Sequence, residues 1–557
     1  MNRYSKLIVL DLISRTRKMI KNIYSKQQNS SSSSSDFRAY LIALLLVSLI
    51  VLIFTFNPNL GYLSDGARYY LVGQSIAAGA GFVQIWDAEI PPDGLSSPLY
   101  PLMIAALSRT VSEGILAMKV MTGLFFLGSI WIYFSLFKRI GLSQEALMLT
   151  LLPLVFNYWV QIHASLMLTE LPFMFLSGCG LLFYLKSEND GKAKNLNWWL
   201  ALLFAVLTFY MRTIGIVLAV SIVLNELSKL RWKRALVAAS IFIGIFLPWM
   251  IRGMYLDVLT HFDLISALNP LVPFGAKADF FDIVQRIDIN VINYTSAYLP
   301  SSLIPISRWF SNPGNIFSWL LGISLLGVIA YGMLNIGKYR LFFSFYLLSY
   351  FAILLLYPQA YSGHRFLLAL LPLLYLGLYT GLSSLTNKLK NGTKYSFGIM
   401  ILIAILNLWS LRSLDVELSK PLLPQWEGYF EVANWAGNNL TADAVIATRI
   451  GQEFYLYSIR KTVQFPFFEN ADKILSYLKY KNVTHIVSDD LDYPITDMRE
   501  STRAPLETLR NASPESLKEI YISNSRETKL FEFHYIQPIT GIKGGNEKIK
   551  DFKLRDK

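Results

Sequence analysis

The sequence predicts an all-α polytopic membrane domain of about eleven transmembrane helices, followed by a small extracytoplasmic α/β domain at the C-terminus. The 557 residues are 53% hydrophobic and only 16% charged, against roughly 25% charged residues in soluble domains. Mean hydropathy is +0.40. Apolar runs long enough to cross a bilayer recur along the first three quarters of the chain. The composition then changes abruptly after about residue 411.

Residues 1–38 form a basic segment that ends in a run of serines, Ser30 to Ser35. We expect it to lie on the cytoplasmic side, as a surface helix followed by a flexible linker. The first apolar run has no small-residue cleavage site and is expected to remain as an anchor. The single cysteine, Cys179, lies within an apolar run, which excludes an internal disulfide and indicates a packed thiol.

Eleven apolar runs make up the predicted membrane domain, residues 39–411. They cover residues 39–56, 115–137, 143–160, 166–185, 198–211, 213–228, 234–252, 316–336, 341–357, 365–385 and 395–411. The region 198–228 also allows one kinked span in place of two short ones. In that case every segment downstream would have the opposite orientation in the membrane.

Five connections between these runs are basic, and they alternate along the chain. They contain Lys138 and Arg139; Lys186, Lys192 and Lys194; Lys229, Arg231, Lys233 and Arg234; Lys338 and Arg340; and Lys388, Lys390 and Lys394. The positive-inside rule therefore places them in the cytoplasm of a cell with a plasma (inner) membrane. The net charge of the chain is +13. Short basic clusters between apolar runs are typical of loops that face anionic lipid, and this pattern argues against a nucleic-acid partner.

This orientation leaves three large pieces on the extracytoplasmic side. They are a first long loop, 57–114, a second long loop, 253–315, and the C-terminal domain, 412–557. Within the first, Pro98–Leu107 is apolar but short and predicts a helix lying along the membrane surface. The C-terminal domain shows strand character at 444–448, 462–467 and 484–488 and helical character at 427–439 and 471–481, which predicts an α/β fold.

Ionisable residues beside the apolar runs are the candidate site, because such groups are costly at membrane depth. The predicted topology places on the extracytoplasmic side Asp65, Glu170, Arg212 and Arg365, with His163, His364, Arg68 and Tyr69 as further members. Asp65 and Glu170 are candidates for a catalytic base, with or without a divalent metal ion. Arg212, Arg365 and His364 are candidates for binding a lipid phosphate. Arg68, Tyr69 and His163 would support them.

Each candidate also has a plainer interpretation. Asp65 and Glu170 could cap helix N-termini, and the arginines could extend to lipid headgroups. Arg68 could pair locally with Asp65. The two histidines could be ordinary interfacial residues.

The order of these motifs resembles the GT-C glycosyltransferases that use polyprenyl-phosphate sugars, specifically the family 39 and ArnT-like group. Asp65 with Arg68-Tyr69-Tyr70 resembles the first-loop aspartate motif, and Ser97-Pro98-Leu99-Tyr100-Pro101-Leu102 resembles the following surface helix. Thr169-Glu170-Leu171-Pro172, Arg212-Thr213-Ile214-Gly215 and His364-Arg365-Phe366-Leu367 match later motifs. The chain departs from the family at Gly66, where glutamate is common.

This resemblance implies an inverting transfer of a sugar from a polyprenyl phosphate to a lipid, glycan or protein acceptor. In the family the first-loop aspartate is the proposed base or metal neighbour, a role that the resemblance carries to Asp65. The second acidic position corresponds to Glu170 and the late arginine to Arg365. Two other classes remain open: a transporter or flippase of lipid-linked sugars, and a non-catalytic membrane assembly protein. The sugar, the acceptor, the metal and the oligomeric state do not follow from the sequence.

Overall fold

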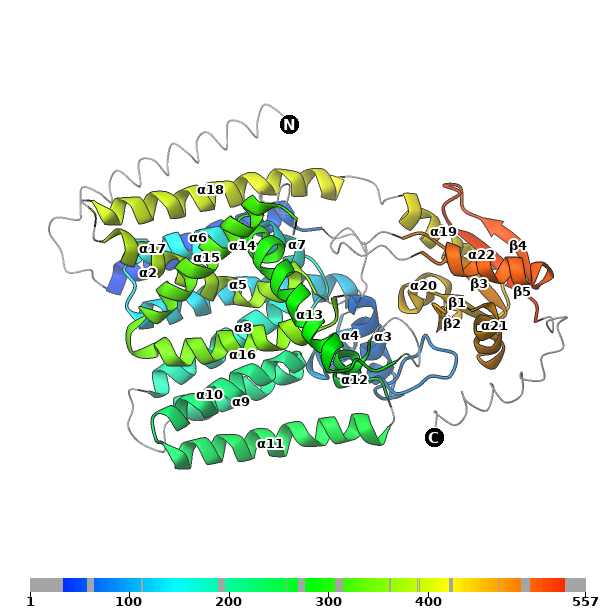
Figure 1. Cartoon of the computed structure of the whole chain (residues 1–557), viewed down its shortest axis with the longest axis horizontal. Helices are drawn as coiled ribbons and strands as arrows, with labels where there is room; N and C mark the ends of the chain where they lie inside the picture. The colour runs from blue at the N-terminus through cyan, green and yellow to red at the C-terminus, as the bar shows by residue number, and fades with distance from the viewer. Residues whose placement is uncertain are drawn as a thin grey trace.

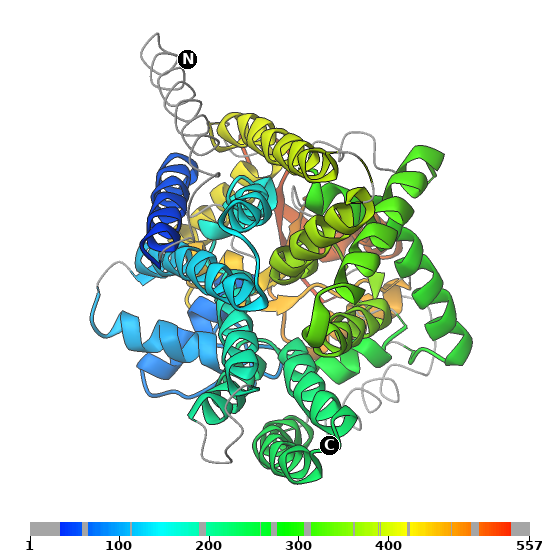
Figure 2. The ribbon, with the colours of Figure 1, turned by 90° about the vertical axis from the view of Figure 1, so that its left-hand side faces the viewer.

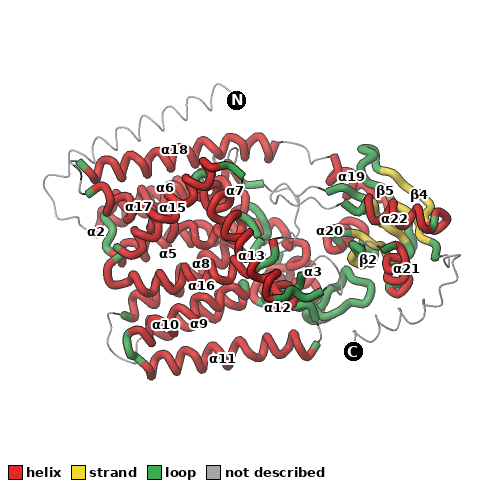
Figure 3. Tube along the Cα trace, viewed as in Figure 1, coloured by secondary structure: helices red, strands yellow, loops and turns green. Residues whose placement is uncertain are grey.

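The chain folds into a bundle of long helices and, at one end of it, a small α/β domain (Figure 1). The computed structural model describes residues 34–57, 65–111, 114–188, 196–256, 258–268, 276–305, 314–359, 362–387, 389, 391–419, 424–468, 470–491 and 501–535. Most of the basic N-terminal segment lies outside these ranges. Strands of the sheet occur only in the α/β domain among these residues (Figure 3). The predicted fold class is confirmed.

Seven helical segments are long and apolar enough to cross a membrane, and each matches one predicted span. They are Phe37–Thr55 within α2 (Ser34–Thr55), α5 (Gly114–Ile140), α11 (Trp232–Tyr255), α15 (Ile316–Leu334), Gly337–Leu356 ending in α16 (Arg340–Leu356), His364–Thr386, and Gly392–Leu414 within α18 (Gly392–Ser419). The segment His364–Thr386 consists of η6 (His364–Leu370) and α17 (Leu371–Thr386). The chain is thus an integral membrane protein.

The other four predicted spans have shapes that hydropathy alone does not reveal. The run 143–160 is a bent pair, α6 (Gln144–Val155) and α7 (Tyr158–Ala164), which meet at 65°. The remaining three are α8 (Glu170–Ser187), α9 (Leu196–Met211) and η1 with α10 (Thr213–Gly215 and Ile216–Ser228). Among these, α9 and the η1–α10 segment have 16 residues each and reach only about 24 Å at 1.5 Å per residue.

The bend between α6 and α7 is fixed by Asn157, which is fully buried. Its Oδ1 accepts from Val160 N and caps α7, while its Nδ2 donates to Ser302 O, the Tyr375 hydroxyl and Asn407 Oδ1. One side chain therefore joins the break to three distant segments. Such an interior amide needs all these partners because the surrounding core is apolar.

The region 198–228 forms two helices, not one kinked span. A Cβ placed on Gly215 would lie 2.4 Å from the Thr208 carbonyl, so the chain turns back tightly on α9 at this point. A Cβ on Gly180 in α8 would meet both Phe204 of α9 and Leu218 of α10. The two helices thus lie side by side against α8, and the alternative with a single span is wrong.

The bundle has two chemically different ends (Figures 1 and 2). One end, which we call the site end because it carries the candidate residue Asp65, contains α3 (Asp65–Ala77), α4 (Leu99–Ser108) and the α/β domain. At the opposite, basic end lie the connections α10–α11 and α15–α16. There Glu188 pairs with Lys229 and with Arg231 at 3.1 Å.

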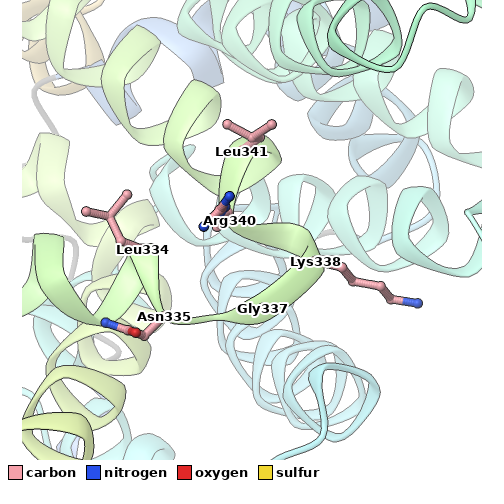
Figure 4. A pocket seen from close by; sticks show the side chains of 6 residues that line it. All are labelled: Leu334, Asn335, Gly337, Lys338, Arg340 and Leu341. Carbon is pink, nitrogen blue, oxygen red and sulfur yellow. The ribbon is translucent and has the colours of Figure 1, made fainter.

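A surface depression lies at the basic end, between α15 and α16 (Figure 4), whereas α3 and α4 lie at the other end of the bundle (Figure 1). It is lined by Leu334, Asn335, Gly337, Lys338, Arg340 and Leu341, which cover the end of α15, the turn after it and the start of α16. This turn carries one of the five basic clusters and has no contact with the candidate site residues.

The two long loops both contain helices. In the first, α4 packs tightly on α3: a Cβ on Gly73 would lie 2.5 Å from the Ile104 side chain. The second contains α12 (His261–Ser266), α13 (Phe280–Asn293), the π-helical η2 (Tyr294–Tyr298) and α14 (Leu299–Leu303). Asn290 of α13 donates to the carbonyls of Leu355 and Tyr357, which holds this loop against the end of α16.

The α/β domain has a five-stranded mixed sheet in the order β2-β1-β3-β5-β4. The strands are β1 (Val445–Thr448), β2 (Lys461–Gln464), β3 (His485–Ser488), β4 (Leu517–Ile522) and β5 (Lys529–Phe533). The first three are parallel, and β5 is antiparallel to β3 and β4. The helices are α19 (Pro424–Asn439), α20 (Gly451–Ser458), α21 (Ala471–Tyr480) and α22 (Arg503–Ala512).

Three strands and two helices of this domain were expected at these positions. The sequence did not predict β4, β5, α20 or α22. No residue of β4 is buried, and half of its residues are exposed. The alternating apolar pattern that marks a strand is therefore weak there. The helix α20 has only eight residues, too few for a clear helical period.

Candidate active site

Four charged side chains from four separate elements meet at the site end of the bundle. Arg365 Nη2 donates to Asp65 Oδ2 at 2.7 Å, and Arg365 Nε donates to Glu170 Oε1 at 2.8 Å. Arg212 Nη1 also donates to Glu170 Oε1. The result is a continuous chain of ion pairs, Asp65–Arg365–Glu170–Arg212. We call these four residues the charged network.

Each member of the network lies where a helix begins. Asp65 is the first residue of α3 and Glu170 the first of α8, so both carboxylates face the positive end of a helix dipole. Arg212 precedes η1 in an extended conformation, with φ −153° and ψ 136°. Arg365 lies in the first turn of η6. Helix starts at one end of the bundle therefore bring together residues up to 300 positions apart.

Exposure changes steeply across the charged network. The Glu170 side chain is 2% exposed, those of Arg212 and Arg365 are 16% and 19% exposed, and that of Asp65 is 43% exposed. The site is thus open at Asp65 and closed behind Glu170. Both guanidinium groups also lie 5.4 Å from the ring centre of Phe366, which supports them on one side.

Electrostatics keep Asp65 ionised in this arrangement. Burial opposes its charge, but the neighbouring Arg365 guanidinium outweighs that cost and holds the pKa of Asp65 below its usual range. Burial and the Asp65 charge raise the pKa of Tyr69 to about 12. Tyr69 therefore remains a neutral phenol at physiological pH. Its ring packs edge-on against Tyr100, with 5.4 Å between ring centres.

The two predicted histidines have different surroundings. His364 Nε2 lies 2.5 Å from Ser301 Oγ, and its ring stacks on Trp159 at 4.3 Å. His163 is buried, and its Nδ1 lies 2.8 Å from Trp159 O, which requires the proton on Nδ1. Among the described residues, His163 Nε2 and Glu170 Oε2 have no hydrogen-bond partner. The interior side of the site thus contains two buried acceptors.

Arg68 pairs directly with Asp93, while its charge also acts on nearby Asp65 and helps to lower the pKa of that carboxyl. Arg68 Nη1 lies 3.3 Å from Asp93 Oδ1, and its guanidinium lies 5.7 Å from the Trp86 ring centre. Asp93 is fully buried and also accepts from Ser96 N at 2.9 Å. Asp65 forms its own direct ion pair with Arg365.

Two residues near the site were missed from the sequence. Asp93 orders the first long loop, and a Pro-Pro-Asp-Gly turn was the available signal. His261, from the second long loop, lies 3.2 Å from the Tyr357 hydroxyl through Nδ1. Burial and the positive charge of Arg212 lower the pKa of His261 to about 4, so it is neutral at physiological pH. No local pattern marks His261, because its loop position carries no periodicity.

The charged network does not fit a metal site. Among the described residues, no three His, Cys, Asp or Glu side chains gather closely enough to hold an ion. The Arg365 guanidinium lies between Asp65 and Glu170 and supplies the positive charge that a metal would otherwise bring. We derive no step through a metal ion.

Comparison with known proteins gives a clear answer for the fold only. No protein-family model matches the chain, and no curated protein matches it in sequence. Crystal structures of ArnT from Cupriavidus metallidurans match it with a TM-score of 0.54, at 11% identity in the apo state and 12% when bound to undecaprenyl phosphate. These matches cover 89% and 91% of this chain and 98% and 99% of ArnT.

A second solved structure has the same architecture in part. It is the archaeal oligosaccharyltransferase AglB from Archaeoglobus fulgidus, in complex with an inhibitory peptide and a dolichol-phosphate. The TM-score is 0.52 at 12% identity, over 91% of this chain and 75% of AglB. At such identities the likeness concerns the fold, and on that evidence the chain has the fold of the GT-C glycosyltransferases, as its motifs led us to expect.

Proposed function

We propose that this protein is a glycosyltransferase that moves a sugar from a polyprenyl-phosphate donor to an acceptor hydroxyl. One observation carries the proposal: the charged network combines two carboxylates and two arginines at one end of a bundle with the GT-C fold. Solved structures of that fold were obtained with undecaprenyl phosphate and with dolichol-phosphate. We place the site on the extracytoplasmic side of the plasma membrane, because the basic connections lie at the other end.

In this proposal the arginines bind the donor phosphate. Arg365 and Arg212 are fixed by Glu170, which is buried and cannot move to solvent. An incoming phosphate has two or three oxygens to accept their N–H groups, a geometry that suits guanidinium. Since Asp65 is the most exposed member of the network, it is the member that a phosphate can displace from Arg365.

This displacement would prepare Asp65 as the base. Free of Arg365, its carboxylate loses the charge that lowers its pKa, and its affinity for a proton rises. Asp65 then removes the proton of the acceptor hydroxyl, whose oxygen attacks the anomeric carbon. The bond between that carbon and the phosphate oxygen breaks, and its electron pair stays on the phosphate, beside Arg212 and Arg365. A single displacement of this kind inverts the anomeric centre.

The test is transfer from a panel of polyprenyl-phosphate sugars, read as release of free polyprenyl phosphate. The purified wild-type protein should release it from at least one donor. Asp65→Asn should abolish release while retaining binding of polyprenyl phosphate, because the arginines remain. Wild-type turnover in Asp65→Asn would exclude Asp65 as the base. Movement of intact donor across sealed liposomes without release would favour a flippase.

A further inference from the structure

The edge strand β2 of the α/β domain is paired with the first long loop. Thr462 N donates to Trp86 O at 2.8 Å, and Ala88 N donates to Thr462 O at 3.1 Å. Asp87 is bridged to Thr462 in parallel orientation. Residues 85–88, which we call the clasp strand, thus extend the sheet next to β2. An edge strand offers a row of free backbone groups, and pairing with a second segment is the usual way to satisfy them.

Side chains reinforce this pairing from both partners. Trp86 is 4% exposed and packs with Leu71 and Val72 of α3 and with Tyr455 and Leu456 of α20. Lys461 Nζ donates to Ile85 O at 2.6 Å. A buried tryptophan between two elements makes a large apolar contact with little freedom to slide. The α/β domain and α3 are therefore held through the same side chain.

We propose that this clasp positions α3, and through it Asp65, for sugar transfer, an inference that rests on the function proposed above. The path is short: Asp65 and Arg68 lie in the first turn of α3, Arg68 lies over Trp86, and Trp86 is bonded through its carbonyl to β2. The α/β domain contributes no member of the charged network. Its role in the reaction is to fix the helix that presents the base.

Backbone groups point to opposite sides at successive residues of a β-strand. The hydrogen bonds between β2 and the clasp strand can therefore be removed without disturbing those between β2 and β1. Phe465 N donates to Thr448 O of β1, so the backbone groups of residues 461, 463 and 465 face β1. Those of Thr462 and Gln464 face away from it. Proline is tolerated at such outward positions on an edge strand. Thr462→Pro therefore removes both donors to Trp86 O, the backbone N–H and the side-chain Oγ1 at 3.2 Å, and leaves the β1–β2 ladder in place.

A second variant reaches the clasp from the other partner. Ile90 N donates to Asp87 O, which makes Ala88 the second residue of a four-residue turn, a position that favours proline. Ala88→Pro removes the donor to Thr462 O without changing the α/β domain. Gln464→Pro is the matched control, since Gln464 lies on the same outward side of β2 and has no bond to the clasp strand among the described residues.

The experiment combines hydrogen exchange of α3 amides, kcat for sugar release and Kd for polyprenyl phosphate, on full-length protein. Ala88→Pro, which removes one hydrogen bond of the clasp, should raise exchange in α3 and lower kcat about fivefold. Thr462→Pro, which removes two, should change both at least as much. The Kd should stay unchanged, because the arginines bind the phosphate. Gln464→Pro should match wild type in all three measurements.

The proposal is overturned if Thr462→Pro and Ala88→Pro both leave α3 exchange and kcat at wild-type values. It is also overturned if Gln464→Pro changes them as much, because the effect would then come from any proline in β2. If Thr462→Pro fails to fold, Ala88→Pro decides. If the wild type transfers no sugar, the proposed function fails, whereas hydrogen exchange still reports on the clasp.

Discussion

Replacing Glu170 by glutamine is expected to destabilise the protein and, at the same time, to tighten its binding of a lipid phosphate. Glu170 is buried and its Oε1 accepts from both Arg212 and Arg365. Glutamine keeps the shape and one acceptor oxygen but removes the negative charge. Two guanidinium groups then share one site with only the partly exposed Asp65 to balance them.

The two effects have separate magnitudes. Breaking a buried ion pair by removing one partner costs about 3 kcal/mol of folding free energy. Binding of the phosphate changes in the opposite direction, because Glu170 repels it. For a unit charge about 6 Å away and an effective dielectric constant of about 20, that repulsion is roughly 3 kcal/mol. Screening by solvent at the open side reduces it, so we expect at least about a tenfold decrease in Kd.

The assay is thermal unfolding in detergent, with and without polyprenyl phosphate, together with direct titration of that lipid. Glu170→Gln should unfold at lower temperature than wild type without ligand and should gain more from added ligand. Glu188→Gln is the control, since the Glu188 side chain is only 8% exposed and also pairs with two cations, Lys229 and Arg231, but at the basic end. It should lose stability with no change in Kd.

Unchanged Kd in Glu170→Gln would refute the reasoning, because the phosphate would then not bind beside the charged network. Weaker binding would refute it too, since it would mean that Glu170 fixes the arginines more than it repels the ligand. Unchanged stability would show that the ion pairs of the network do not form.

Three further predictions concern the base, the hairpin and the orientation. Arg365 holds the pKa of Asp65 below its usual range, so its carboxylate keeps its charge until the pH is well into the acidic range. We therefore expect kcat/KM to stay flat from about pH 5 to 7, with the acid limb of kcat at higher pH than that of kcat/KM. An acid limb of kcat/KM near pH 6 in the wild type would contradict this. Gly215→Ala should cost about 1–3 kcal/mol in thermal unfolding, since the new Cβ meets the preceding helix, whereas Gly244→Ala, with open space, should be neutral. Cysteines at Glu89 and Lys338 should label from opposite sides of sealed vesicles; labelling from the same side would invert the topology.

The hydropathy of short sequence segments was sufficient to predict most helices of the membrane domain. Hydropathy marks a helix such as α15 because its sequence is strongly apolar over the length of a membrane span. The same criterion gave 143–160 as one span and did not show its bend of 65°. The bend depends on Asn157 meeting Ser302, Tyr375 and Asn407, and those partners lie more than a hundred residues away.

For the candidate site, too, the sequence identified residues but not the contacts between them. The motifs singled out Asp65, Glu170, Arg212 and Arg365 because charges beside apolar runs are rare. They did not show that one guanidinium bonds both carboxylates, or that Arg68 pairs with Asp93. Pairing depends on distance across the fold, and sequence spacing gives no measure of that distance.

By itself, the sequence determined that this chain spans a membrane many times, carries an α/β domain after its last span, and places scarce charges beside the starts of its helices. Only the tertiary structure decided which charges meet, that residues 198–228 turn back as a hairpin, and that β2 takes a strand from the first long loop. The reason is physical: hydropathy and periodicity are properties of residues close together in the sequence, so they can be read from the sequence alone. Hydrogen bonds and ion pairs between distant segments form only after packing has brought those segments together.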